Sequence, residues 1–149
     1  MVEQTSTPAP QEKTPYQKAF EIANNIPEFY DIEPRFKLAN VEGTVQDYLK
    51  KQLWGRAGNQ FVFVAAHVAL HNANSKEVPP KFVECLKKAK ENYEKYAPQV
   101  IEKYRGTYTK RIEGLTFLIA NPELAFKAEV DVLTKRGRLK PATGLNVVH

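Results

Sequence analysis

The sequence predicts an all-α fold, a four-helix-bundle-like body that follows an extended, proline-kinked N-terminal arm. Apolar residues recur at helical spacing through most of residues 43–149, and prolines and single glycines divide this stretch into helix-length segments. Residues 1–42 hold four basic and seven acidic side chains, a net charge of −3, whereas residues 43–149 hold eighteen and ten, a net charge of +8. We therefore expect two parts, an arm over residues 1–42 and a helical bundle domain with a short C-terminal tail over residues 43–149.

The arm begins with a proline-rich polar stretch, whose composition cannot bury enough apolar surface to offset the entropy of ordering. Residues 16–25 are predicted to form a short helix, with Thr14 as N-cap and Pro15 at the first helical position. Pro27 ends this helix, and Pro34 breaks the chain again. The apolar side chains that follow need a partner surface, either the chain's own bundle or another molecule. They are Phe29, Tyr30, Ile32, Phe36 and Leu38.

The first body helix is expected to begin near Gly43, with Thr44 as its cap. Gly55 and Gly58 then interrupt the pattern, either as a loop or as a point of close packing. Residues 61–72 are apolar on nearly every side, which is typical of a central helix buried by its neighbours. A buried strand is the alternative because Phe and Val favour strands, but the alanine-rich continuation favours a helix.

Three further helices are expected in the second half of the body. Pro79 and Pro80 begin one that Pro98 ends, and residues 99–120 form the next. The last begins with Asn121 as N-cap and is closed by Gly137. Four tyrosines share one face of the first two of these helices, where they form a core in a monomer or a subunit interface in an assembly. They are Tyr93, Tyr96, Tyr104 and Tyr108.

The composition argues against several classes of protein. A single cysteine, Cys85, excludes an internal disulfide framework, and its place on the apolar side of a helix predicts a buried, inert thiol. The N-terminus has no apolar segment of a secretory signal. The longest apolar run, residues 61–70, is too short to cross a bilayer. We expect a soluble protein in surroundings that do not require disulfides.

His67 and His71 are the only candidates for a metal site. They are four residues apart and share a helix face, so both imidazoles could contribute to a metal, but no third ligand lies nearby in the sequence. A histidine pair in an apolar helix more often serves packing and hydrogen bonding. No activated nucleophile, no pair of buried carboxylates and no glycine-rich phosphate loop is evident. We therefore expect a protein that is not an enzyme and needs no cofactor or metal.

The basic residues occur in doublets and clusters, which can neutralise successive phosphates with release of about one counterion per contact. The alternative is that these lysines only form the solvated faces of amphipathic helices. Arginines near glycines or helix ends favour phosphate contact, with readout of the DNA backbone rather than of its bases. The candidate DNA-binding residues are Lys13, Lys18, Arg35, Lys37, Lys50, Lys51, Arg56, Lys87, Lys88, Lys90, Lys103, Arg105, Lys110 and Arg111.

Two stretches resemble the major capsid proteins of filamentous double-stranded-DNA viruses of hyperthermophilic archaea. Residues 118–144, LIANPELAFKAEVDVLTKRGRLKPATG, are similar to the end of those proteins, where an Asn-Pro-Glu opens the final helix and a Pro-Thr-Gly-like segment ends the chain. Residues 41–70 share the pattern of a polar helix, a glycine-bearing joint and an apolar helix. By length and basic balance, the chain is more similar to the enveloped lipothrix-type members than to the naked rods.

The resemblance implies a bundle body whose N-terminal arm wraps DNA, with Pro27 and Pro34 where the arm would bend. It implies dimers of this chain or of two paralogous capsid proteins, stacked as a helical filament on A-form DNA. Such a virion is assembled in the host cytoplasm, and whether a lipid envelope surrounds it is left open. The negative charge of residues 1–42 departs from this pattern. Either the few cations of the arm face the DNA, or the arm binds neighbouring subunits.

We therefore expect a structural virion coat protein that packages double-stranded DNA without sequence preference. The first alternative is a cellular, basic, helical nucleic-acid-binding protein that acts as a monomer or small oligomer. The second, less favoured, is a metal-binding enzyme that uses His67 and His71.

Overall fold

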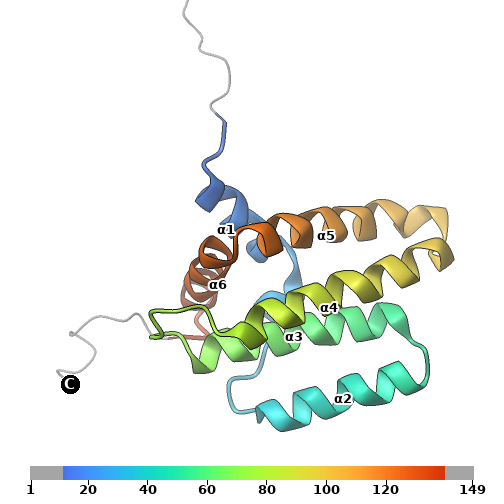
Figure 1. Ribbon diagram of the computed structural model, residues 1–149, viewed down its shortest axis with the longest axis horizontal. Helices are drawn as coiled ribbons and strands as arrows, with labels where there is room; N and C mark the ends of the chain where they lie inside the picture. The colour runs from blue at the N-terminus through green and yellow to red at the C-terminus, as the bar shows by residue number, and fades with distance from the viewer. Residues whose placement is uncertain (1–11, 140–149) are drawn as a thin grey trace, which may run out of the picture.

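The computed structural model describes residues 12–139, and these residues form six α-helices and two single-turn 3-10 helices without a strand (Figure 1). The prediction of an all-α fold is confirmed. The elements are α1 (Pro15–Asn25), η1 (Pro27–Phe29), α2 (Leu38–Lys50), α3 (Trp54–His71), α4 (Pro80–Tyr96), η2 (Ala97–Gln99), α5 (Glu102–Ala120) and α6 (Pro122–Lys135).

Four of the helices build a bundle-like body. Helix α3 packs against both α2 and α4, and α4 packs in turn against α5 (Figure 1). Helices α1 and α6 pack against each other, and both also contact α5 at one end of the body. The predicted four-helix-bundle-like arrangement is compatible with the packing of α2, α3, α4 and α5. Helices α1 and α6 add a second pair to it.

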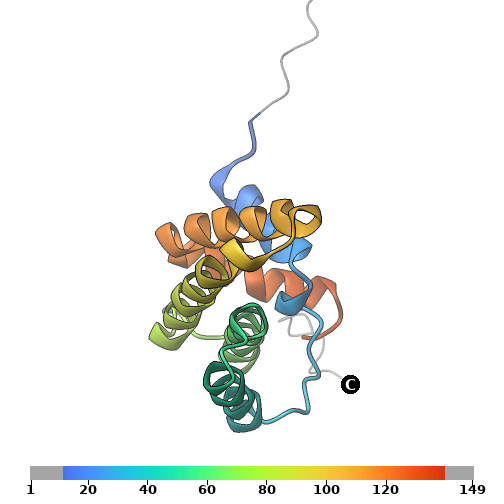
Figure 2. The same ribbon diagram turned by 90° about the vertical axis from the view of Figure 1, so that its right-hand side faces the viewer.

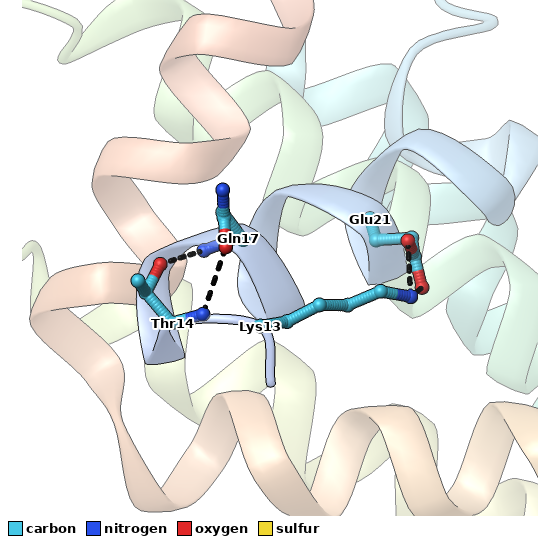
Figure 3. Close-up of polar contacts among 4 residues, drawn as sticks. All are labelled: Lys13, Thr14, Gln17 and Glu21. Carbon is cyan, nitrogen blue, oxygen red and sulfur yellow. Dashed lines mark hydrogen bonds and ion pairs between the residues drawn. The ribbon is translucent and has the colours of Figure 1, made fainter. Parts of the chain in front are cut away.

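Helix α1 begins as the sequence predicts. The hydroxyl of Thr14 accepts a hydrogen bond from the Gln17 amide at 3.1 Å, and the Gln17 side chain accepts one from the Thr14 amide at 2.8 Å (Figure 3). This reciprocal capping box satisfies two backbone donors that a helix start otherwise leaves unpaired. Lys13 adds an ion pair with Glu21 at 2.6 Å along the same helix (Figure 3).

The described part of the arm packs on the chain's own bundle. Ala19 and Ala23 of α1 are buried, and so are Phe29 and Ile32 farther along, all within the same core as the later helices. Phe36 is the exception, since 58% of it is exposed. Residue 42, where the sequence suggests a division between arm and body, lies inside α2.

Helix α2 begins at Leu38, so the predicted start near Gly43 with Thr44 as cap is wrong. Leu38, Val41 and Val45 continue one apolar stripe through that region, with Val41 and Val45 buried. The helix tolerates Gly43 because a glycine inside a helix costs only about 1 kcal/mol, less than tertiary packing can recover. Thr44 therefore lies in the helix interior, and its hydroxyl donates to the Asn40 carbonyl at 3.2 Å.

Gly55 and Gly58 are points of close packing within α3 rather than a loop. A Cβ atom at Gly55 would lie 2.7 Å from the Tyr96 ring, and one at Gly58 would lie 2.6 Å from the Tyr93 ring. The predicted central helix is confirmed, since most residues from Gly55 to Ala69 are buried, and the strand alternative is wrong.

The ends of the last two helices follow the predictions only in part. Asn121 precedes α6, but its side chain donates backward to the Phe117 carbonyl at 2.9 Å and does not cap α6. Helix α5 begins at Glu102 rather than at residue 99, because Pro98 lies in the short turn η2. Gly137 closes α6 with a φ of +78°, which glycine adopts without the strain of a Cβ atom.

Candidate nucleic-acid interface

Two connections of the bundle, α2–α3 and α4–α5, meet at one end of the body. We call residues 50–56 and 95–105 the joint end, which lies at the right of Figure 1 and faces the viewer in Figure 2. The Lys95 ammonium lies 4.7 Å from the centre of the Trp54 ring, and the Tyr96 ring covers Gly55. These contacts hold the two connections together although they are about forty residues apart in the sequence.

The joint end is strongly basic. It contains six basic side chains and one acidic one, Glu102, so its net charge of +5 equals that of the whole chain. The charges of the remaining residues sum to zero. A concentrated charge of one sign steers oppositely charged partners. The six cations are Lys50, Lys51, Arg56, Lys95, Lys103 and Arg105.

Several of these cations are available to a partner. Lys50 and Arg56 are exposed, and neither forms an ion pair with another residue between 12 and 139. Lys103 lies 5.4 Å from the ring centre of Tyr104. Arg105 donates from Nε to the Val100 carbonyl at 3.2 Å. Lys51 is the exception, because it pairs with Asp47 at 3.3 Å.

The joint end also exposes apolar side chains. Leu53, Ile101 and Tyr104 are 37%, 63% and 49% exposed. Among residues 12–139 only Phe36 is a further exposed large hydrophobic residue. Apolar area left in water forgoes roughly 25 cal/mol per Å² of burial, and such clusters mark interaction surfaces. The joint end therefore combines cations with apolar groups that a partner could cover.

The candidate cations of α4 and α5 outside the joint end are less concentrated. Lys88 lies 3.8 Å from Glu84, and Lys90 lies 3.9 Å from Glu94, in pairs one helical turn apart. Lys87 and Lys110 are exposed, with no ion pair to any other residue that the structure describes. The acids that alternate with lysine along α4 thus offset much of its positive charge.

Most candidate cations of the arm already contact other residues of the same chain. Lys13 pairs with Glu21, and Arg35 pairs with Glu33 at 2.9 Å. Hydrogen bonds from Arg35 lower the pKa of the Glu33 carboxyl. Lys18 lies 5.8 Å from the Phe117 ring centre, so it covers an aromatic face of α5. Lys37 is exposed at the start of α2.

Arg111 is held inside the fold. Its Nη1 atom lies 2.9 Å from Glu28 Oε1, and it donates to Asn59 Oδ1 at 2.8 Å and to the Tyr93 hydroxyl at 2.9 Å. Burial would lower the pKa of Arg111, but Tyr93 and Glu28 more than offset this and raise it. The sequence shows Arg111 only as half of a basic doublet with Lys110, although the helix turns it inward. Its guanidinium therefore serves the core and is a poor candidate for a phosphate contact.

The tyrosines predicted to share one face divide between core and surface. Tyr93 is fully buried, and burial raises the pKa of its hydroxyl. Tyr108 contacts both Tyr93 and Tyr96, with ring centres 5.7 Å and 5.1 Å apart. Tyr93 thus belongs to the core, Tyr96 and Tyr108 are half-buried in contact with each other, and Tyr104 is the most exposed of the four.

The sequence did not single out Lys95 or Trp54 as part of an interface. Lys95 stands among the alternating charges of α4, and Trp54 is the only tryptophan in the chain. A lone tryptophan beside a pair of lysines is the one signal that could have indicated this surface, since cations stack on its ring.

The two histidines lie on one face of α3, with ring centres 6.3 Å apart. His67 is buried and His71 is exposed. Burial, together with the nearby His71, lowers the pKa of His67. Over residues 12–139, no group of three or more metal-binding side chains is arranged around one point. Cys85 is buried as predicted, and burial raises the pKa of its thiol to about 11.

None of the helices in the part of the chain that the structure describes has both the length and the apolar character needed to cross a membrane. Comparison with protein-family models, with curated proteins and with solved structures found no match to this chain.

Proposed function

We propose that this protein is a structural coat subunit that binds double-stranded DNA without sequence preference and packages it in a helical filament. The observation that carries the proposal is the joint end, where two separate connections meet and contribute six cations and three exposed apolar side chains. Phosphates are the partner that such a group of lysines and arginines would neutralise.

The composition of the joint end favours the DNA backbone over the bases. Four of its six cations are lysines, which contact phosphates as flexible point charges and carry little geometric information. Binding of this kind depends on salt and tolerates any sequence, as a packaging protein requires. Because the chain resembles capsid proteins of filamentous archaeal viruses, the proposal includes that the packaged duplex is in the A form.

Assembly is the second part of the proposal. The exposed Leu53, Ile101 and Tyr104 would be covered by a second copy of the chain or by a paralogous capsid protein. Dimers formed in this way would stack along the DNA in a virion that is assembled in the host cytoplasm. A lipid envelope, if the virion has one, would lie outside this nucleoprotein filament.

Charge removal at the joint end tests the DNA interface. A triple variant, Lys50→Gln, Arg56→Gln and Lys103→Gln, is compared with Lys76→Gln, Lys127→Gln and Lys135→Gln, which removes the same charge at exposed lysines outside the candidate set. Each lost phosphate contact reduces the slope of log K against log salt by about 0.9, so the first variant is expected to lose roughly two to three from that slope. Equal losses in both variants would show that the joint end is not the interface.

Electron microscopy with long duplex DNA tests the assembly. Regular filaments of uniform width are expected from the wild-type protein, and none from the joint-end triple variant at moderate salt. Single bound copies without a regular repeat would instead favour a cellular nucleic-acid-binding protein.

A further inference from the structure

A cavity of about 470 Å³ lies outside the joint end, between the 31–36 connection and helices α2 and α3. The connection can be followed in light blue in Figure 2. A volume of this size falls in the range of about 300–1,000 Å³ that small-molecule sites occupy. Ile32 and Val41 are buried in its walls, and Phe36 and Phe63 line it as well. A ligand in this cavity would therefore cover apolar side chains.

The charged side chains around the cavity are paired within the chain. Glu33 accepts a hydrogen bond from Arg35 Nε at 2.9 Å, and Asp31 lies 4.0 Å from Arg138. These two acids and two arginines have a net charge of zero. A charged ligand would lose its hydration in the cavity without meeting an unpaired opposite charge, which costs free energy. The charges of the cavity therefore favour a neutral ligand.

The uncharged polar groups of the helices offer both donors and acceptors. Gln60 donates from Nε2 to the Val41 carbonyl at 3.0 Å, which leaves its second N–H group and its side-chain oxygen for a ligand. The Thr44 hydroxyl donates to the Asn40 carbonyl at 3.2 Å and can still accept. A ligand group that donates and accepts at once, as a hydroxyl does, matches both side chains.

His67 is the buried polar side chain that lines this cavity. Only 1% of its surface is exposed, and its Nδ1 atom has no hydrogen-bond partner among residues 12–139. Burial lowers the pKa of His67, which favours the neutral ring with one donor and one acceptor nitrogen. A buried polar group without a partner lowers the stability of the fold. A hydroxyl can supply the missing partner to either kind of nitrogen.

We infer that this cavity binds a small neutral alcohol, with its hydroxyl at His67 and its hydrocarbon part against Phe36 and Phe63. The hydroxyl forms hydrogen bonds with uncharged groups, so it needs no counter-charge. The hydrocarbon part displaces water from the apolar walls, which favours binding. An ammonium or a carboxylate on the same hydrocarbon would find only charges that are already paired. The inference does not depend on the proposed function.

The test uses the full-length protein at pH 7 and three six-carbon probes that differ only in the head group: hexanol, hexylammonium and hexanoate. Calorimetry is expected to show saturable 1:1 binding of hexanol, with both ions at least about tenfold weaker. Amide NMR shifts with hexanol are expected at residues 31–36, 44, 60, 63 and 67. Tighter binding of either ion, absence of saturable hexanol binding, or shifts confined to other residues would overturn the inference.

A matched pair of variants locates the hydroxyl. His67→Phe keeps a ring but removes both nitrogens, so it is expected to weaken hexanol binding about three- to tenfold, the range of one hydrogen bond. His71→Phe makes the same change at an exposed position one helical turn away, outside the cavity, and is expected to leave hexanol binding unchanged.

Thermal unfolding followed by circular dichroism checks that both histidine variants fold. Thr44→Val removes a second polar group from the half-buried side of α2 and is expected to weaken hexanol binding about twofold or more, so the test does not depend on the folding of His67→Phe. Hexanol affinity that is unchanged in the folded cavity variants, or reduced equally by His71→Phe, would contradict the site.

Discussion

At the scale of single residues, the most unusual group is Glu129 of α6. It is buried, and neither carboxylate oxygen has a hydrogen-bond partner among the described residues. Burial raises its pKa well above the ordinary value of 4.5, so folding favours the protonated form of this side chain. A carboxyl in this state lowers the stability of the fold, since it loses its water contacts without gaining a partner.

Glu129→Leu is expected to increase the free energy of unfolding at pH 7 by about 1–3 kcal/mol. Above pH 4.5 the unfolded chain releases this proton while the folded chain retains it, so wild-type stability falls as pH rises towards the folded pKa. Urea unfolding at pH 5 and pH 8 measures this, and the variant is expected to lose less stability between them. An unchanged pH dependence would mean that Glu129 is not the group responsible.

Gly58 provides a second residue-scale prediction. Gly58→Ala places a Cβ atom 2.6 Å from the buried Tyr93 ring, so the unfolding free energy is expected to fall by about 1–3 kcal/mol despite alanine's better helix propensity. Gly106→Ala on α5 is the control, because a Cβ atom added there would meet no other atom within 4 Å. Gly106→Ala is therefore expected to raise the unfolding free energy by up to about 1 kcal/mol, because it improves helix propensity without a steric clash. Thermal unfolding of both variants decides the comparison, and equal stabilisation would contradict the close packing.

At the scale of elements, the Arg111 cluster joins four parts of the fold. Arg111 of α5 contacts Glu28 of η1, Asn59 of α3 and Tyr93 of α4, and Tyr93 itself donates to Asn59 at 2.5 Å. A buried charge with several partners fixes the relative placement of the helices that supply them, because each partner left alone would be an unsatisfied polar group.

Arg111→Met is expected to lower the unfolding free energy by about 3–5 kcal/mol, since it leaves the Glu28 carboxylate buried without its cation. The double variant with Glu28→Gln is expected to lose less than the sum of the two single changes. Denaturant unfolding gives all three values, and DNA affinity measured on the folded fraction is expected to stay near that of the wild type. A loss of affinity without loss of stability would instead place Arg111 at the DNA.

At the scale of the whole molecule, α1 and η1 are part of the core. Ala19, Ala23 and Phe29 are buried, and Ile22 lies against Gly114 of α5 so closely that a Cβ atom there would approach it to 2.8 Å. Tyr16 bonds to Asp131, and Arg136 lies 3.9 Å from the Tyr30 ring centre. Arg138, just after α6, also lies 4.0 Å from Asp31, so one acid of residues 1–42 is paired with a cation near the C-terminal end of the described chain.

Truncation tests whether α1 stabilises the body. Removal of residues 1–26 is expected to lower the melting temperature clearly, because it uncovers the faces of α5 and α6 that Ala19 and Ala23 bury. Removal of residues 1–12 leaves Thr14 and its capping box in place, so the melting temperature is expected to stay within about 2 °C of the wild type. Calorimetry of the two truncated proteins provides the test. Equal melting temperatures would show that α1 does not stabilise the body.

The sequence by itself determined the all-helical class, the capping of α1 by Thr14, the start of α6 directly after Asn121 and its closure by Gly137. Each of these depends on a few neighbouring residues, through helical periodicity, a cap or a backbone angle. Only the tertiary structure decided that Gly55 and Gly58 are packing points, that Arg111 is internal, and that two basic connections form one joint end. These features join residues between 18 and 83 positions apart, and such contacts depend on how helices pack, which no local pattern encodes.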